Sequence, residues 1–237
     1  AGNAPRPGRA YHPDEPWLVP SMPEGAPATA PIPEDAAHLL IALVRAHPGQ
    51  VRVVTAGPLT NIALALRLAP DIAGLARDIV IEGGGFDMQR ARVTGNTDYA
   101  TDFNFMFDPE AAHIVLTAPW KRITLMGNVT GSVKMTEALK ADIASAGTPV
   151  ARYFGAYAKV GQPLWDEMTS AVAVDPTLAT KELVARMDVD LMPGPGYGTA
   201  QIWNEKFAPH LGEQEVHIVE AIDADRFVAR FTAQARK

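Results

Sequence analysis

Hydrophobic positions along the chain follow two spacings, one typical of buried strands and one typical of amphipathic helices. Residues 51–55 and 79–81 are short β-branched runs, and apolar residues recur at helical spacing between them, from Ile62 to Leu68. A strand, a helix and a second strand in that order predict a β-α-β unit with parallel strands. The pattern therefore predicts an α/β fold that is Rossmann-like, with a mostly parallel central sheet flanked by helices.

The remaining elements continue this alternation. A helix is predicted to begin at Glu34-Asp35 and to end before His47-Pro48-Gly49. Helical spacing predicts further helices over residues 109–116 (with Asp108 as N-cap), 135–146, 150–160, 165–174 and after Asp223. Strand patterns predict strands over residues 122–126, 183–191 and 215–222.

Two regions differ in composition. Residues 1–33 are dense in Pro and Gly and have no periodicity, so they are predicted to form a loop or the remnant of an N-terminal region. This segment is interpreted as a linker or, alternatively, as part of a loop over the ligand-binding site. Residues 34–237 are predicted to form one α/β domain, with no repeat and no second domain visible.

Composition excludes several classes of protein. The net charge is −6 and basic residues are scattered, which argues against a nucleic-acid partner. The absence of cysteine removes disulfides and thiolate chemistry. No apolar run approaches the ~18 residues of a membrane helix. These features leave the compartment open: cytoplasmic by default, periplasmic if an upstream signal peptide was removed.

Polar residues follow the strands of the β-α-β unit. Ala56-Gly57 and Glu82 to Gly85 come directly after strands, where ligands of open α/β sheets bind and where Gly allows close approach. Asn96, Asp102 and Asn104 follow in the next segment. Amides and carboxylates without bulky cations suit hydroxyl groups better than phosphates. The sequence therefore predicts a sugar ligand.

Four motifs in one order carry a family resemblance. They are Gly57-Pro-Leu-Thr-Asn-Ile-Ala, Thr94-Gly-Asn, Asp102-Phe-Asn followed by Asp108-Pro-Glu-Ala-Ala, and Leu164-Trp-Asp. From about Pro33 to its C-terminus the chain resembles the nucleoside hydrolases, the calcium-dependent N-ribohydrolases that are inosine-uridine-preferring or purine-specific. The resemblance implies hydrolysis of ribonucleosides to base and ribose by a Ca²⁺-bound water, and a homo-oligomer, dimer or tetramer.

The resemblance also assigns roles to residues. It implies that the Ala56 carbonyl and the Asp166 carboxylate are calcium ligands, and that Asn96, Asp102 and Asn104 bind ribose hydroxyls. The family usually has Glu in place of Asp102. A shorter side chain there requires a water or a shifted sugar.

Two further positions bear on the substrate. Glu82 stands where the family has Met. Either Glu82 pairs with a nearby Arg such as Arg90 or Arg92, or it contacts the substrate and alters preference. Trp165 stands where pyrimidine-accepting members have a His that could act as general acid. An indole there could stack on a purine and assist its departure, whereas the alternative is a core Trp at the start of a buried helix.

The family's N-terminal aspartate cluster has no counterpart in this sequence. Either the sequence is a fragment or it is a degenerate homologue, and the completeness of the downstream motifs favours the fragment. Three alternatives to the hydrolase stay open at this point. They are a non-catalytic ribose- or nucleoside-binding homologue, a dinucleotide-dependent dehydrogenase, which the Gly pattern disfavours, and a subunit that associates with a metal-bearing partner chain.

Overall fold

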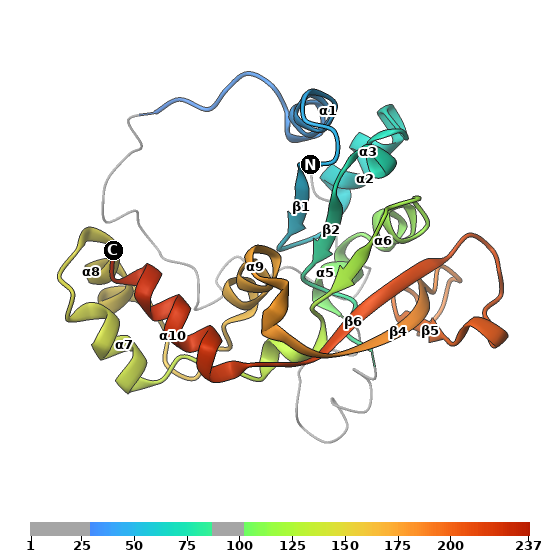
Figure 1. Ribbon diagram of the computed structural model, residues 1–237. Helices are drawn as coiled ribbons and strands as arrows, with labels where there is room; N and C mark the ends of the chain where they lie inside the picture. The colour runs from blue at the N-terminus through green and yellow to red at the C-terminus, as the bar shows by residue number, and fades with distance from the viewer. Residues whose placement is uncertain (1–28, 87–101) are drawn as a thin grey trace.

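The fold is built on one six-stranded sheet, seen in a computed structural model that describes residues 29–86 and 102–237 (Figure 1). The first four strands in spatial order are mutually parallel, β4 is antiparallel to β6, and β5 is antiparallel to β4, which confirms the mostly parallel α/β fold. In spatial order the strands are β1 (Arg52–Thr55), β2 (Asp78–Ile81), β3 (Ile123–Leu125), β6 (Gln214–Ile222), β4 (Ala179–Val189) and β5 (Ala200–Trp203).

Helices connect the strands and begin at the side chains that the sequence indicates. Asp35, Asp108 and Asp223 each accept a hydrogen bond from a backbone N–H in the first turn of the helix that follows, as predicted for Asp108 and Asp223. The helices are α1 (Ala36–Ala46), α2 (Thr60–Leu68), α3 (Ile72–Leu75), α5 (Phe103–Phe107), α6 (Pro109–Leu116), α7 (Glu137–Ala144), α8 (Pro149–Tyr157), α9 (Trp165–Val174) and α10 (Ala224–Ala235).

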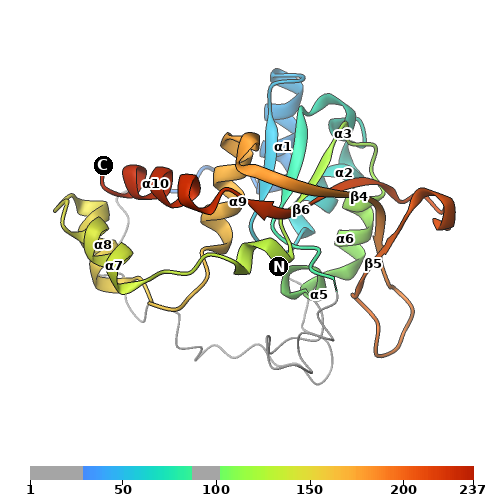
Figure 2. The ribbon, with the colours of Figure 1, turned by 60° about the horizontal axis from the view of Figure 1, so that its bottom comes forward.

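Helices cover both faces of the parallel strands, and the side chains of β2 are buried on both faces. Ile79 and Ile81 pack into the core formed with α1, α2 and α6, whereas Val80 packs with α9 on the opposite face. Figure 2 shows α1, α2, α3 and α6 gathered on one side of the strands and α9 on the other. The continuous apolar run of β2 follows from this, because a strand buried on both faces cannot alternate.

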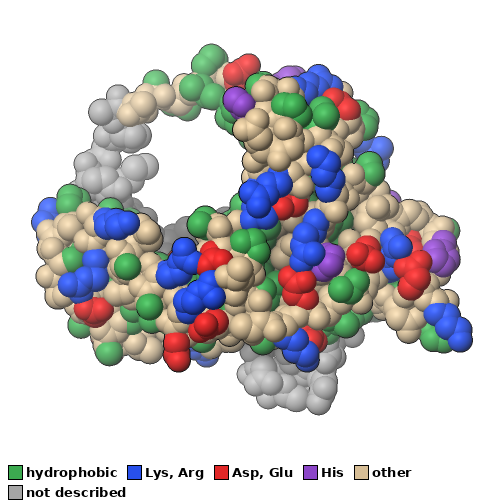
Figure 3. Space-filling view, viewed as in Figure 1, with side chains coloured by type: hydrophobic (Ala, Val, Ile, Leu, Met, Phe, Trp, Pro, Cys, Tyr) green, Lys and Arg blue, Asp and Glu red, His purple; other side chains and the backbone are tan. Residues whose placement is uncertain are grey.

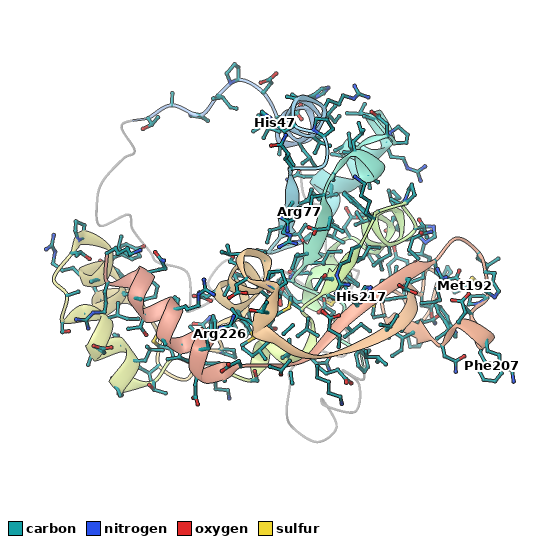
Figure 4. All side chains as sticks on the ribbon, viewed as in Figure 1. His47, Arg77, Met192, Phe207, His217 and Arg226 are labelled. Atoms are coloured by element: carbon teal, nitrogen blue, oxygen red, sulfur yellow. The ribbon has the colours of Figure 1, made fainter. Side chains whose placement is uncertain are left out.

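The helices α7, α8 and α10 pack together beside the sheet (Figure 1). Phe231 of α10 packs against Phe227 and Phe154, with ring centroids 6.0 Å and 5.7 Å apart. Asp175, directly after α9, pairs with Arg226 of α10, which Figure 4 labels. Hydrogen bonds from Thr177 and Arg226 lower the pKa of Asp175 to about 2. These contacts tie the end of α9 to the start of α10.

The structure differs from the predicted elements in a few places. Strand β4 begins at Ala179 rather than at Leu183, and β5, α3 and α5 were not predicted. The last strand in sequence, β6, lies between β3 and β4, which no local pattern indicates. Residues 29–33 carry no helix or strand, and the rest of the Pro/Gly-rich segment lies outside the described residues, so the division at residue 33 stays a prediction.

The surface carries charges of both signs. On the face seen in Figure 3, basic and acidic side chains lie interspersed over the sheet and α10. Every helix among the described residues is too short or too polar to traverse a lipid bilayer.

Candidate active site

The predicted site residues that the structure describes come from the carboxyl ends of β1 and β2 and from two helix N-termini. Thr55 pairs with Ile81 in the sheet register, so Ala56 and Glu82 leave the two strands side by side. The backbone N–H of Glu82 donates to the Thr55 carbonyl at 2.9 Å. The site therefore lies at the edge where ligands of open α/β sheets bind.

Glycines allow the loops at this edge to approach closely. A Cβ on Gly127, two residues after the end of β3, would lie 2.7 Å from the backbone nitrogen of Gly85. Asn128 holds the same two loops together, because its side chain accepts from Phe86 N–H at 3.0 Å and donates to the Phe86 carbonyl at 2.9 Å. The loops after β2 and β3 therefore pack with backbone on backbone, and the Asn128 side chain links them.

Glu82 is part of a polar cluster within these loops. The Asn104 side-chain amide nitrogen (Nδ2) donates to the Glu82 carbonyl at 3.0 Å and to the Glu82 carboxyl oxygen Oε2. The Thr130 hydroxyl lies 3.4 Å from the other carboxyl oxygen. Burial, together with the negative charges of Asp102 and Asp166, raises the pKa of Glu82 to about 8. Glu82 is therefore largely neutral at pH 7.

The arginines proposed as partners of Glu82, Arg90 and Arg92, lie outside the described residues. The contacts of Glu82 that the structure describes are to an amide and a hydroxyl instead.

Asp102 is held by backbone donors. One of its carboxyl oxygens accepts from Phe105 N–H at 3.1 Å, which caps α5, and the other accepts from Gly85 N–H at 3.2 Å. Burial raises the pKa of Asp102, and the backbone hydrogen bonds act in the opposite direction. The backbone N–H groups of Gly84 and Asn104 also act on this carboxylate, and its contact to a ribose hydroxyl stays a proposal. Asn96 lies outside the described residues.

Trp165 and Asp166 open helix α9. The Trp165 side chain is 40% exposed, whereas its neighbours Leu164 and Met168 are buried in the core, so Trp165 is not the core residue of the alternative interpretation. Partial burial raises the pKa of Asp166. Asp166 is close enough to Glu82 for its charge to raise the pKa of Glu82.

The acids of the site lack basic partners within the part of the chain that the structure describes. In that part no Lys, Arg or His forms an ion pair with Glu82, Asp102 or Asp166. Uncompensated carboxyl groups at one edge of the sheet favour a ligand that is positively charged or rich in hydroxyl groups.

A calcium site is only partly represented by the predicted ligands. Calcium takes six to eight oxygens. The Ala56 carbonyl and the Asp166 carboxylate offer oxygen ligands of the kind that calcium binds, but two groups supply too few of them. Within residues 29–86 and 102–237 no group of three or more His, Cys, Asp or Glu side chains is arranged to hold a metal. These residues therefore do not by themselves fit a calcium ion.

Thr130 is the site residue that sequence reasoning missed. It lies in Gly127-Asn-Val-Thr, which begins two residues after the end of β3, and it is buried with its hydroxyl facing Glu82. Its position at a strand end was the available signal. Asp108, by contrast, has the capping role that was expected, because it accepts from Ala111 N–H and from the Thr60 hydroxyl.

Comparison with known proteins agrees with this geometry. The family model described as inosine-uridine preferring nucleoside hydrolase matches residues 9–229. An uncharacterized protein of Schizosaccharomyces pombe is 34% identical over 195 residues, which cover 75% of this chain and 50% of the relative. The inosine-uridine preferring nucleoside hydrolase of Leishmania major is 34% identical over 169 residues, which cover 66% of this chain and 51% of the relative.

A solved structure extends the comparison to the fold. The purine-preferring ribonucleoside hydrolase from Gardnerella vaginalis superposes with a TM-score of 0.76 at 25% identity, over 88% of this chain and 67% of that one. This chain belongs to the nucleoside hydrolase family. It spans about half the length of the curated relatives it matches.

Proposed function

We propose that the protein hydrolyses the N-glycosidic bond of ribonucleosides to free base and ribose, with a preference for purine nucleosides. The observation that carries the proposal is the cluster of Glu82, Asp102, Asn104 and Asp166 at the carboxyl ends of the parallel strands. Family membership supports it. Because the chain spans about half of its relatives' length, the activity of the whole protein is itself part of the proposal.

The cluster suits the charge that this reaction develops. Cleavage of a glycosidic bond passes through an oxocarbenium-like transition state, in which the sugar ring becomes positive. Asp102 and Asp166 have no cationic partner among the described residues, so their negative potential is available to that charge. Asn96, Asp102 and Asn104 are proposed to hold the ribose hydroxyls, which fixes the sugar relative to the attacking water.

The preference for purines rests on Trp165. Its indole is 40% exposed beside Asp166, where it can stack on a base. Stacking on a purine favours its protonation and so assists its departure without a side-chain acid. The names of the relatives do not decide the preference, because one is called inosine-uridine preferring and another purine-preferring.

Were calcium bound, the Ala56 carbonyl and the Asp166 carboxylate would be two of its ligands, and the ion would supply a bound water of lowered pKa.

The test is base release from inosine, adenosine and uridine by the purified protein, followed by chromatography of the free base and a reducing-sugar assay for ribose. We expect release from the purine nucleosides to exceed release from uridine. We expect a chelator to abolish it and added Ca²⁺ to restore it.

Two results would change the conclusion. Ribose binding without base release, unaffected by chelator, would favour the non-catalytic binding homologue. Activity that is stronger on uridine, or unchanged in Trp165→Ala, would remove the purine preference and the stacking role.

A further inference from the structure

The orientation of the Asn104 amide is fixed by its contacts. The Glu82 backbone carbonyl lies 3.0 Å from Asn104 Nδ2. A carbonyl oxygen can only accept a hydrogen bond, so the atom facing it must be the amide nitrogen. The Glu82 carboxyl oxygen Oε2 contacts the same nitrogen. One residue, Glu82, therefore accepts both hydrogens of the Asn104 amide.

The side-chain oxygen, a hydrogen-bond acceptor, is then the only polar group of the Asn104 amide that a ligand can use. Its side-chain oxygen receives no hydrogen bond from the residues that the structure describes, and the residue is 9% exposed. An Asn whose two donors are both used offers its carbonyl oxygen to a ligand, and the matching ligand group is a hydroxyl donor. The donors of Asn104 are not available to a ligand oxygen.

The Glu82 carboxyl is itself held in place. The Thr130 hydroxyl carries one hydrogen and lies 2.8 Å from the Gly127 carbonyl and 3.4 Å from the Glu82 oxygen Oε1. The Thr130 hydroxyl hydrogen is therefore shared between the Gly127 carbonyl, which is closer, and Oε1. The side chain is therefore anchored by Thr130 at one oxygen and by Asn104 at the other.

We propose that Glu82 is a positioning residue that acts through Asn104 rather than on the substrate. By taking both amide hydrogens, it makes Asn104 a dedicated acceptor for one sugar hydroxyl. A Met in this position, as in the family resemblance, has no comparable second acceptor for the amide. The inference rests on the proposed function, because it states how that same site holds its sugar.

The test is a double-mutant cycle with Glu82→Met, which removes the acceptor at similar length, and Asn104→Ala. The probes are D-ribose as an inhibitor and inosine as a substrate. We expect Glu82→Met to raise the inhibition constant and KM roughly tenfold, with a smaller change in kcat. In the Asn104→Ala background the same change should have no further effect. Glu82→Gln is the comparison variant: its carbonyl oxygen can still accept from Asn104, so its inhibition constant and KM should change less than those of Glu82→Met.

Three kinetic results would overturn the inference. The first is an additive effect of Glu82→Met in the Asn104→Ala background, which would mean direct contact with substrate. The second is an equal loss in Glu82→Gln and Glu82→Met, which would assign the effect to charge. The third is a Glu82→Met variant whose inhibition constant for D-ribose and KM for inosine equal those of the wild type.

A second measurement separates this inference from the proposed function. NMR of the side-chain NH₂ group of Asn104, assigned by its disappearance in Asn104→Ala, reports the two hydrogens without any ligand. We expect both hydrogens to be protected from exchange in the wild type and one to exchange at least tenfold faster in Glu82→Met. If the wild type neither binds ribose nor releases base, the proposed function fails while this readout still tests the positioning. Equal exchange rates of the Asn104 amide hydrogens in the wild type and in Glu82→Met would overturn the positioning role of Glu82.

Discussion

Acidic residues at the two ends of the parallel strands differ in whether they pair with a basic residue. At the amino ends of β1 and β2, the carboxylate of Asp78 receives two hydrogen bonds from the Arg52 guanidinium, at 2.5 Å and 2.6 Å. At the carboxyl ends, Glu82, Asp102 and Asp166 form no ion pair with a described residue. The strands are the same, so the difference lies in what surrounds their ends.

A second set of paired charges lies along the sheet between β3, β6 and β4. Arg122, just before β3, contacts Glu182 of β4 at 2.7 Å, and His217 of β6, labelled in Figure 4, lies 3.2 Å from the same carboxylate. The Asp78 hydrogen bond raises the pKa of Arg52, whereas burial and neighbouring acids raise the pKa of Glu82. Paired charges stabilise the fold, whereas neighbouring acids without a basic partner repel one another until a ligand binds. The amino edge therefore contributes to stability, and the carboxyl edge is suited to ligand binding.

The largest effect is expected at the buried pair. Asp78→Ala leaves the Arg52 guanidinium unpaired in a side chain that is only 16% exposed, and should lower the free energy of unfolding by about 3 kcal/mol. Urea denaturation measures this. The matched control is Asp71→Ala, which removes an exposed partner of Arg45 and should change stability little. Equal losses in the two variants would contradict the difference between buried and exposed pairs.

At the carboxyl edge the change should appear in catalysis. Asp166→Ala should reduce base release from inosine at least ~100-fold, because it removes a proposed metal ligand and a negative charge beside the reacting sugar. Its carboxylate makes no hydrogen bond to a described residue, so the melting temperature should stay within a few degrees of wild type. Activity that is retained would remove the metal role.

The pH dependence of stability should report Glu82. Its ordinary pKa is 4.5 and its folded value is about 8, so between these values the unfolded chain loses the proton while the folded chain keeps it. Ionisation therefore favours unfolding as the pH rises through this window, and the effect is complete above it. Relative to Glu82→Gln, the melting temperature of the wild type should fall by roughly 10 °C from pH 4.5 to pH 8. Parallel curves would mean that Glu82 is ionised in the folded protein.

The smallest effect is expected at the partly exposed contacts of Glu182 on the sheet. Glu182→Gln weakens the contacts to Arg122 and His217, whose side chains are 39% and 19% exposed, and should cost less than about 1 kcal/mol. Its kcat and KM for inosine should equal those of the wild type. A loss of activity in this variant would show that these paired charges also affect the site.

Much of the secondary structure is determined by local sequence. The β-branched runs of β1 and β2 and the helix caps Asp35, Asp108 and Asp223 each involve residues close in sequence, so their patterns are sufficient to predict them. The Gly-rich turns after these strands likewise identify the edge where the site lies. The individual roles of the site residues stay predictions.

Only the tertiary structure decided which strands and side chains meet. The insertion of β6 between β3 and β4 depends on packing across the whole sheet, and the short strand β5 exists because it pairs with β4. The contact of Glu82 with Asn104 spans 22 residues, and its contact with Thr130 spans 48. Local periodicity carries no information about such distances. The sequence by itself therefore determined where polar residues follow strands, whereas the fold decided that Glu82 meets an amide and a hydroxyl, because burial and strand order bring them together.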